Sequence, residues 1–141
     1  MAVEAGAEHF PHGADIGVRG IGHTREQAFE QAAVALTEIV TEVANIVPRD
    51  MVEIECAAPN DGLLLTDWLN RLIYEMAVQH MVFGRFAVTI DDGHLQGRAW
   101  GETLDHARHA TTVEPKGATF TALKVECRSD GAWIAQCVID V

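Results

Sequence analysis

The spacing of apolar residues changes along the chain, and this change constrains the fold most. Apolar residues recur every three or four positions in residues 24–43 and 63–80, and they alternate with other residues in several shorter runs. The first spacing is typical of a helix with one buried face, and alternation is typical of a strand. The order is strand, helix, strand, helix and then four strands. It predicts an α+β fold of two layers, with helices packed on one face of a mainly antiparallel sheet.

Turn and cap residues refine this prediction. Thr24 and Gln27 have the spacing of a capping box, so the first helix is predicted to begin at Thr24. Asp61 is the predicted N-cap of the second helix, which covers residues 63–80. The pairs Asp92-Gly93 and Asp130-Gly131 each predict a tight hairpin, because the central residues of a type I′ turn need positive φ angles. The predicted strands comprise residues 16–21, 52–56, 86–90, 94–102, 119–127 and 132–141.

Composition limits the class of protein. The chain has 141 residues and no internal repeat, which predicts a single domain over residues 1–141. A formal net charge of −11 repels polyanions, so we expect no direct binding of nucleic acid. No apolar run approaches the roughly 20 residues that span a bilayer, and the first ten residues lack the features of a secretion signal. We expect a cytoplasmic protein without a membrane partner.

Familiar nucleophile and nucleotide motifs are absent from the sequence. Ser129 is not part of a G-x-S-x-G motif, and the glycines near residue 20 match no nucleotide-binding fingerprint. Three widely spaced cysteines predict reduced, buried thiols, of which Cys127 and Cys137 lie in apolar strand patterns. Glu53 and Glu55 are expected to raise the pKa of Cys56. Two polar residues and a tryptophan on the second helix, Glu75, His80 and Trp68, are interpreted as edge or core residues.

Carboxylates at both ends of the chain are the candidates for chemistry. His12 and Asp15 lie in H-G-A-D-I-G, just before a predicted strand, where Asp15 is either a ligand or a turn cap. Asp140 ends an apolar strand, and Val141 follows it with a main-chain carboxylate. These acids would repel one another if they met, unless a cation neutralised them. Hard divalent cations prefer such a set of oxygen ligands.

Two further groups are weaker candidates. Lys116 lies between a proline and a glycine, where it either clamps a phosphate, balances carboxylates or is simply solvated. In D-H-A-R-H, residues 105–109, His106 and His109 either share a helical face as metal ligands or lie in a partly solvated loop. No H-E-x-x-H motif supports the metal interpretation, and the sequence favours the loop.

Six segments, in order, resemble the archease family of accessory proteins. They are H-G-A-D-I-G-V-R-G at residues 12–20, T-R-E-Q-A-F-E-Q-A-A at 24–33, D-G-L-L-L-T-D-W-L-N-R-L-I-Y-E at 61–75, G-R-A-W-G-E at 97–102, V-E-P-K-G-A-T-F at 113–120 and the terminal V-I-D-V. The resemblance covers nearly the whole chain. It implies a two-layer archease-like fold without catalysis of its own.

The resemblance also implies a function and a site. Archeases are described as proteins that bind a divalent cation and activate the GTP-dependent tRNA-splicing RNA ligase, by promoting its guanylylation and its multiple turnover. The matching metal ligands are Asp15, Asp140 and Val141, and the lysine important for ligase activation matches Lys116. The cation expected is Ca²⁺, Mg²⁺ or Mn²⁺. The expected partner is the ligase itself.

Two departures from the family pattern bear on these expectations. Gly13 replaces the usual threonine, and Phe120-Thr121 replaces a tyrosine-histidine pair. The first departure is expected to loosen the loop that presents Asp15, and the second removes two polar groups near Lys116.

Two other functions stay open on the residues alone. One is a small metal-dependent phosphohydrolase using Asp15, Asp140 and the two histidines, and the other is a chaperone-like binding module.

Overall fold

The computed structural model describes residues 4–111 and 113–141, which form eight strands, two α-helices and one short 3₁₀ helix. The elements follow one another as β1 (Gly6–His12), β2 (Asp15–Gly22), α1 (Arg25–Val40), η1 (Val43–Asn45), β3 (Asp50–Ala57), α2 (Asp61–Gln79), β4 (Met81–Asp91), β5 (His94–Thr103), β6 (Gly117–Ala118), β7 (Lys124–Cys127) and β8 (Trp133–Asp140). The predicted α+β class is confirmed. No helix among these residues is long and apolar enough to cross a membrane.

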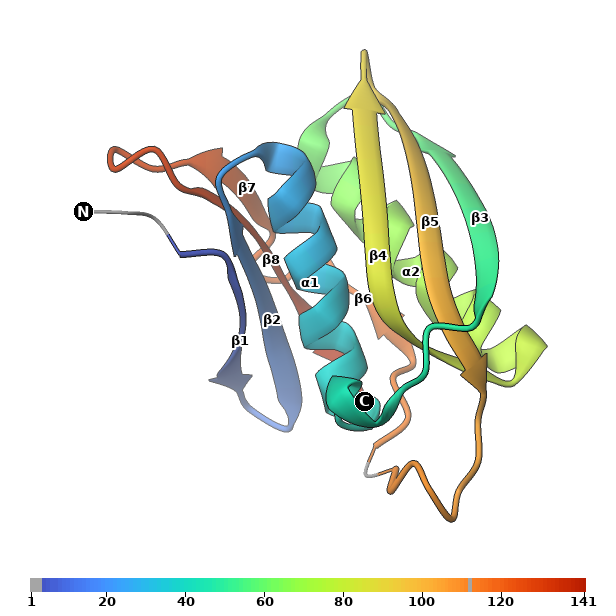
Figure 1. The fold of residues 1–141 in the computed structure, drawn as a ribbon. Helices are drawn as coiled ribbons and strands as arrows, with labels where there is room; N and C mark the ends of the chain where they lie inside the picture. Colours follow the sequence, from blue (N-terminus) through green and yellow to red (C-terminus); the bar gives the residue numbers. More distant parts are fainter. Residues whose placement is uncertain (1–3, 112) are drawn as a thin grey trace.

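The strands form two antiparallel sheets instead of one. The first has the order β1-β2-β8-β6, with β7 also paired to β8, and the second has the order β3-β5-β4. Figure 1 shows α1 between β2 of the first sheet and β4 of the second. The sheets are separate because α1 lies beside the β4 edge, where its side chains bond to the strand. Thr37 Oγ1 donates to the Phe83 carbonyl at 2.9 Å, and Glu30 accepts from the Val88 N–H at 2.9 Å.

Close approach of backbone and large side chains explains how the helices pack. A Cβ added at Gly20 would lie 2.0 Å from the Ala28 carbonyl oxygen, so only glycine lets α1 lie this close to β2. On α2, Trp68 is fully buried over Gly97, and its Nε1–H donates to the Phe29 carbonyl at 3.1 Å. Trp68 is therefore a core residue, as expected. Burial of such a large aromatic side chain contributes strongly to stability.

One of the two predicted caps is confirmed and the other is wrong. Thr24 Oγ1 accepts from the Gln27 N–H at 3.0 Å, while the Gln27 side chain accepts from the His23 N–H at 2.6 Å. At α2, however, the N-cap is Asn60, whose Oδ1 accepts from the Leu63 N–H at 2.9 Å. Asp61 lies in the first helical turn and pairs with Arg25 at 3.0 Å. Asn and Asp are equally good caps, so their order alone did not decide between them.

One of the two predicted turns is confirmed, and two strands, β1 and the two-residue β6, were missed. Asp92 and Gly93 have φ angles of 48° and 74°, as a type I′ turn requires. At the second position β7 and β8 do form a hairpin, although β7 begins only at Lys124. Its turn is not the predicted one, because only Gly131 has a positive φ and the Gly131 N–H donates to the Arg128 carbonyl at 2.9 Å. The strand β1 was not predicted, because its sequence GAEHFPH has no regular alternation of apolar and polar residues.

Two of the three cysteines match the prediction of buried thiols. Cys137 is fully buried, and burial raises the pKa of its thiol to about 12. Cys56 is half-buried, and its pKa rises to about 11, chiefly through burial and next through the charge of Asp67. The glutamates beside Cys56 in the sequence are thus not the main cause. Cys127 is exposed, so its predicted place in the core is wrong.

Candidate functional site

Asp15, Asp140 and Val141 meet at one end of the first sheet. Strand β2 begins at Asp15 and β8 ends at Asp140, and the two strands pair antiparallel with Ile16 opposite Ile139. The start of one strand therefore lies beside the end of the other. The Val141 N–H donates to Asp15 Oδ1 at 3.3 Å, although the two residues are 126 positions apart.

Lys116 joins this group from a third segment. Its N–H donates to the Asp140 carbonyl at 2.7 Å, and the next residue, Gly117, pairs with Asp140 in the sheet. Helix α2 holds this segment in place, because Asn70 Oδ1 accepts from the Ala118 N–H at 2.8 Å and its Nδ2 donates to the Ala118 carbonyl at 3.3 Å. We call Asp15, Lys116, Asp140 and Val141 the terminal site.

The turn before Asp15 explains how this residue is presented. His12 pairs with Asp15, so Gly13 and Ala14 form a two-residue hairpin turn. Gly13 has a φ of +61°, and a positive φ at only the first central position is typical of a type II′ turn. Glycine takes this conformation without strain. The departure from threonine therefore suits the turn instead of loosening it. His12 itself is exposed in this hairpin.

The chemistry of the terminal site is that of oxygen ligands at a wet surface. Asp15 and Val141 are half-buried, and Asp140 and Lys116 are exposed. Among the described residues, no three His, Cys, Asp or Glu side chains are gathered as a metal site would need, and Lys116 makes no ion pair. A cation here would rely on two carboxylate side chains, main-chain oxygen and water. That donor set fits hard divalent cations such as Ca²⁺ and Mg²⁺.

The D-H-A-R-H segment is a loop, as the sequence favoured, but one of its histidines is buried. It forms a turn, and its last residue, His109, is completely buried. His109 Nδ1 accepts from the Asp105 N–H at 2.9 Å, which leaves the proton on Nε2, and Nε2 donates to Glu102 Oε2 at 3.0 Å. Both ring nitrogens are therefore used within the protein. The other histidine, His106, is exposed, and the two do not share a helical face.

Glu102 is the centre of this network and was not identified from the sequence. Its side chain accepts hydrogen bonds from Arg108, from the Val47 N–H at 2.7 Å and from His109. These donors, Arg108 first and the Val47 N–H next, lower the pKa of Glu102 to about 2. We call Glu102, Arg108 and His109 the Glu102 cluster. The signal that could have found it is a glutamate near the end of β5, seven residues before a histidine.

Comparison with known proteins identifies the family. The model of the archease protein family matches residues 8–141. The chain belongs to the archease family. It is 39% identical to the archease of Pyrococcus furiosus over 138 residues, which cover 95% of this chain and 97% of the relative. It is 34% identical to the archease of Methanopyrus kandleri, with 95% and 98% of the two chains covered.

Solved structures of archease-like chains share the fold. The solution structure of Methanobacterium thermoautotrophicum protein 1598 superimposes with a TM-score of 0.84 and 31% identity, covering 96% of this chain and 99% of the other. The crystal structure of an archease from Thermotoga maritima, described as a possible chaperone, has a TM-score of 0.62 and 20% identity over 94% of each chain. Family membership supports an accessory role for this archease family member.

The second departure from the family pattern lies next to the terminal site. Phe120 is 69% exposed, in the loop that follows β6. Thr121 takes part through its backbone, since its carbonyl accepts from the Val138 N–H at 3.0 Å and its N–H donates to Thr119 Oγ1 at 3.2 Å. The loop is therefore fixed on β8 by main-chain bonds. These bonds do not depend on the polar side chains that this chain lacks.

Proposed function

We propose that this protein is a non-catalytic accessory protein that binds a divalent cation and activates a GTP-dependent tRNA-splicing RNA ligase. In the reaction of the ligase, a histidine of the ligase takes GMP from GTP and pyrophosphate leaves. The archease promotes this guanylylation and the repeated turnover of the ligase. Its own residues act at the surface between the two proteins, and the ligase carries out the chemistry.

One observation carries the proposal beyond family membership. Three segments that are distant in the sequence converge on the terminal site, and two hydrogen bonds join them. The Val141 N–H donates to Asp15 Oδ1 at 3.3 Å, and the Lys116 N–H donates to the Asp140 carbonyl at 2.7 Å. These contacts bring the backbone of Asp140 and Val141 close to Asp15, and acidic groups that lie near one another repel unless a cation neutralises them. Their convergence supports a site that is completed by a cation from outside the chain.

The roles of the four residues follow from their charges. Asp15, Asp140 and the main-chain carboxylate of Val141 would hold Ca²⁺, Mg²⁺ or Mn²⁺. When bound, the cation supplies positive charge close to the partner's nucleotide. Lys116 is exposed beside the carboxylates, where its ammonium group either balances their charge or contacts a phosphate.

Charge also indicates what the protein does not bind. A net charge of −11 repels RNA, so contact with the substrate RNA is left to the ligase. The same charge favours a partner with a basic surface, because opposite potentials speed association. We place this interaction in the cytoplasm, together with the ligase.

The test is guanylylation of the host's RNA ligase with GTP and Mn²⁺, with and without this protein. We expect acceleration by the wild type and a loss of acceleration in the variants Asp15→Ala, Asp140→Ala and Lys116→Ala. The variant Asp91→Ala is the matched control, because it removes an exposed carboxylate at the end of β4 in the other sheet. No acceleration by the wild type would overturn the proposal.

The two other candidate functions give different results in parallel assays. A phosphohydrolase would hydrolyse generic phosphate esters alone with Mn²⁺ or Mg²⁺, and Asp15→Ala would abolish turnover. Both ring nitrogens of His109 are bonded within the protein, Nδ1 to the Asp105 N–H and Nε2 to Glu102, which argues against this function. A chaperone-like module would protect client proteins equally well in the Asp15→Ala and Asp140→Ala variants.

A further inference from the structure

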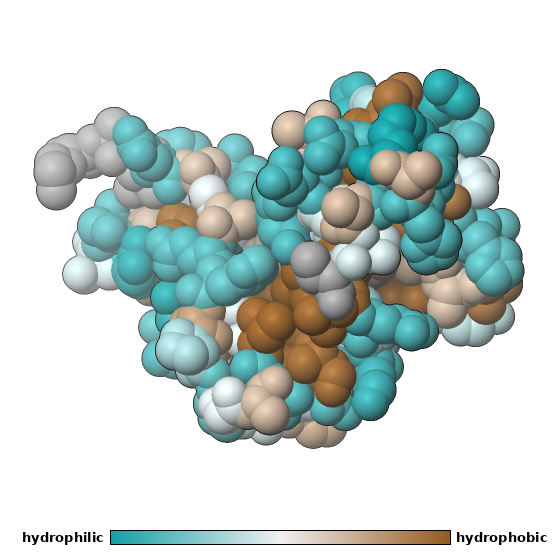
Figure 2. All heavy atoms as spheres, turned by 90° about the horizontal axis from the view of Figure 1, so that it is seen from below, coloured by the Kyte–Doolittle hydropathy of each residue, from teal (hydrophilic) through white to brown (hydrophobic). Residues whose placement is uncertain are grey.

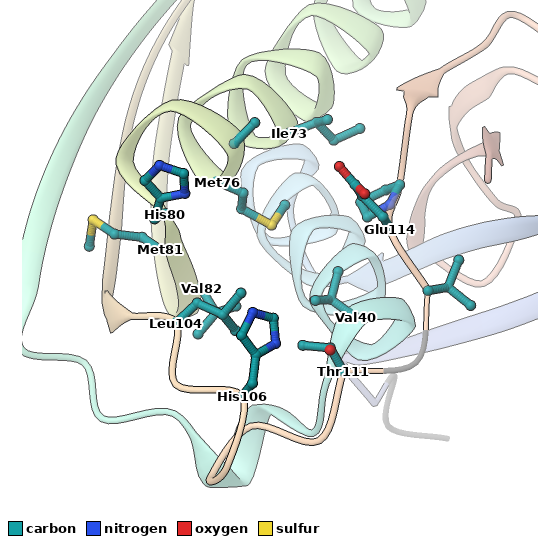
Figure 3. Close-up of a pocket in the computed structure, with 13 residues that line it drawn as sticks. Val40, Ile73, Met76, His80, Met81, Val82, Leu104, His106, Thr111 and Glu114 are labelled. Atoms are coloured by element: carbon teal, nitrogen blue, oxygen red, sulfur yellow. The ribbon is translucent and has the colours of Figure 1, made fainter.

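The ends of both helices border an apolar groove that the terminal site does not use. The groove has a volume of about 390 Å³, and its walls come from the end of α1, the end of α2, the start of β4 and the 104–115 loop. Figure 3 shows Val40, Met76 and Leu104 around the hollow, with His106 and Glu114 at its edge. The view from below in Figure 2 shows hydrophobic side chains gathered on this face. Exposed apolar surface of this kind marks binding sites.

The loop wall of the groove is fixed at both ends. At one end, the Leu104 N–H donates to the His80 carbonyl at 2.8 Å, and the Glu102 cluster holds the turn that follows. At the other end, the Lys116 N–H bonds to the Asp140 carbonyl. The described residues at the two ends of this wall are therefore held in place before anything binds, which lowers the entropic cost of binding.

The groove is continuous with the terminal site through three consecutive residues. Glu114 and Pro115 line the groove, and Lys116 belongs to the terminal site. A partner bound in the groove therefore contacts residues directly next to Lys116 in the chain. The described residues that line it include the acid Glu114 and neither lysine nor arginine, in a chain of net charge −11. Apolar walls with an acidic edge fit a segment that has apolar side chains and basic flanks.

We infer that this groove is the docking site for an apolar segment of the ligase, flanked by lysine or arginine. The inference rests on the proposed function and adds a division of labour. The groove supplies affinity, and the terminal site supplies activation. The segment would lie along α2 and the 104–115 loop, and its basic end would face Glu114.

The experiment measures the dissociation constant of the full-length protein for the ligase, and separately the acceleration of guanylylation at saturating protein. The variant Ala77→Lys places a cation in the groove at an exposed helical position, where lysine is a good helix former. We expect binding to weaken at least ten-fold, while Mn²⁺ affinity and acceleration at saturation are retained. Val78→Lys is the matched control, because Val78 is 53% exposed on the same helix but does not line the groove.

Two further variants test the sign of the charge. Glu114→Lys should weaken binding, and Ala77→Glu should weaken it less than Ala77→Lys does. Equal losses in the two Ala77 variants would overturn the basic character of the segment. Thermal unfolding within about 2 °C of the wild type confirms that each variant is folded.

The remaining outcomes separate this inference from the proposed function. If the wild type accelerates guanylylation and Ala77→Lys binds the ligase as tightly as the wild type, only the docking inference is overturned. If the wild type neither binds nor activates the ligase, both are overturned. If the wild type forms dimers, and Ala77→Lys disrupts these dimers without changing ligase binding, the groove binds a second copy of this chain and the inference is overturned. A hydrophobic dye bound in the groove that the ligase does not displace would also overturn the inference.

Discussion

The Glu102 cluster and the terminal site both combine carboxylates with a basic residue, yet they are built in opposite ways. Glu102 is 3% exposed and accepts hydrogen bonds from a guanidinium, an imidazole and a backbone N–H. At the terminal site the contacts found among the described residues come from backbone N–H groups, and Asp140 and Lys116 are exposed. The protein pairs the charge of Glu102 with its own donors and leaves the charged groups of the terminal site accessible to solvent.

This difference separates structure from function. A buried carboxylate must be paired by the chain, since an unpaired buried charge is very costly. An exposed group of carboxylates is tolerated in water and gains most from an external cation. Substitutions in the Glu102 cluster should therefore change stability, and substitutions in the terminal site should change binding. The following predictions test that separation.

The largest effect on stability is expected for Glu102→Gln. The pKa of Glu102 falls from its ordinary value of 4.5 to about 2, so the unfolded state binds the proton more tightly than the folded state. The stabilisation is present above pH 4.5 and is lost as the pH falls toward 2. Urea unfolding should show a lower midpoint for Glu102→Gln at pH 7 and a difference that shrinks by roughly half or more at pH 3. A constant difference between these pH values would contradict the assignment.

The second effect is on cation affinity. Asp15→Asn and Asp140→Asn each remove one charged ligand of the cation. Loss of a residue that only hydrogen-bonds to a metal ligand weakens metal binding by roughly 10- to 100-fold. Loss of a ligand itself should therefore weaken Mn²⁺ or Ca²⁺ binding by at least this factor. Calorimetric titration measures the affinity. Thermal unfolding without metal should stay close to that of the wild type or rise slightly, because repulsion between carboxylates is relieved. If both variants bind the cation as tightly as the wild type, the cation does not bind at the terminal site.

A smaller loss is expected when the chain is lengthened beyond Val141. A peptide bond then replaces the carboxylate that we assign to the cation, and a neutral carbonyl oxygen is a weaker ligand. A Gly-Ser extension should weaken Mn²⁺ binding by about ten-fold, or about 1.4 kcal/mol. The same extension at the other end of the chain is the control. Equal affinities would mean that Val141 is not a ligand.

The smallest change in stability is expected for loss of a neutral hydrogen bond. This change is the reference against which the effects at the two charged regions are compared. Asn60→Ala removes the N-cap of α2 and should cost about 1 kcal/mol of unfolding free energy. Because the group is neutral, the cost should be the same at pH 3 and pH 7, and Mn²⁺ affinity should not change. A larger cost for Asp61→Ala than for Asn60→Ala in urea unfolding would reverse the assignment of the cap.

Local patterns predicted much of the fold, and distant contacts account for the rest. Helical spacing and the Thr24 cap located α1, and Asp92-Gly93 located a hairpin, because these signals lie within a few residues. The division into two sheets depends on the pairing of β2 with β8 and on the side chains of α1 at the β4 edge. Neither contact leaves a local pattern in the sequence.

The candidate residues show the same limit. Asp15, Asp140 and Lys116 were candidates from the residues alone, and the resemblance assigned their roles. The structure brings the three residues together, while their roles stay predictions. His109 was expected in a partly solvated loop and is buried, where its Nε2–H donates a hydrogen bond to Glu102 in the preceding strand. Exposure of Cys127 could not be foreseen either, since an apolar strand pattern does not say which side chain at its end reaches solvent.

The order of strands in the first sheet has a consequence for how the molecule forms. Strand β8 lies between β2 and β6, so the central strand of that sheet is the last one in the chain, whereas β4 and β5 are joined by a tight turn. Bringing Asp15 to Val141 closes a loop of 126 positions, which is entropically costlier and slower than closing a hairpin. We therefore expect the terminal site to be completed late in folding. A cation bound at that site would hold together the part of the chain that is slowest to assemble, and would so resist its opening.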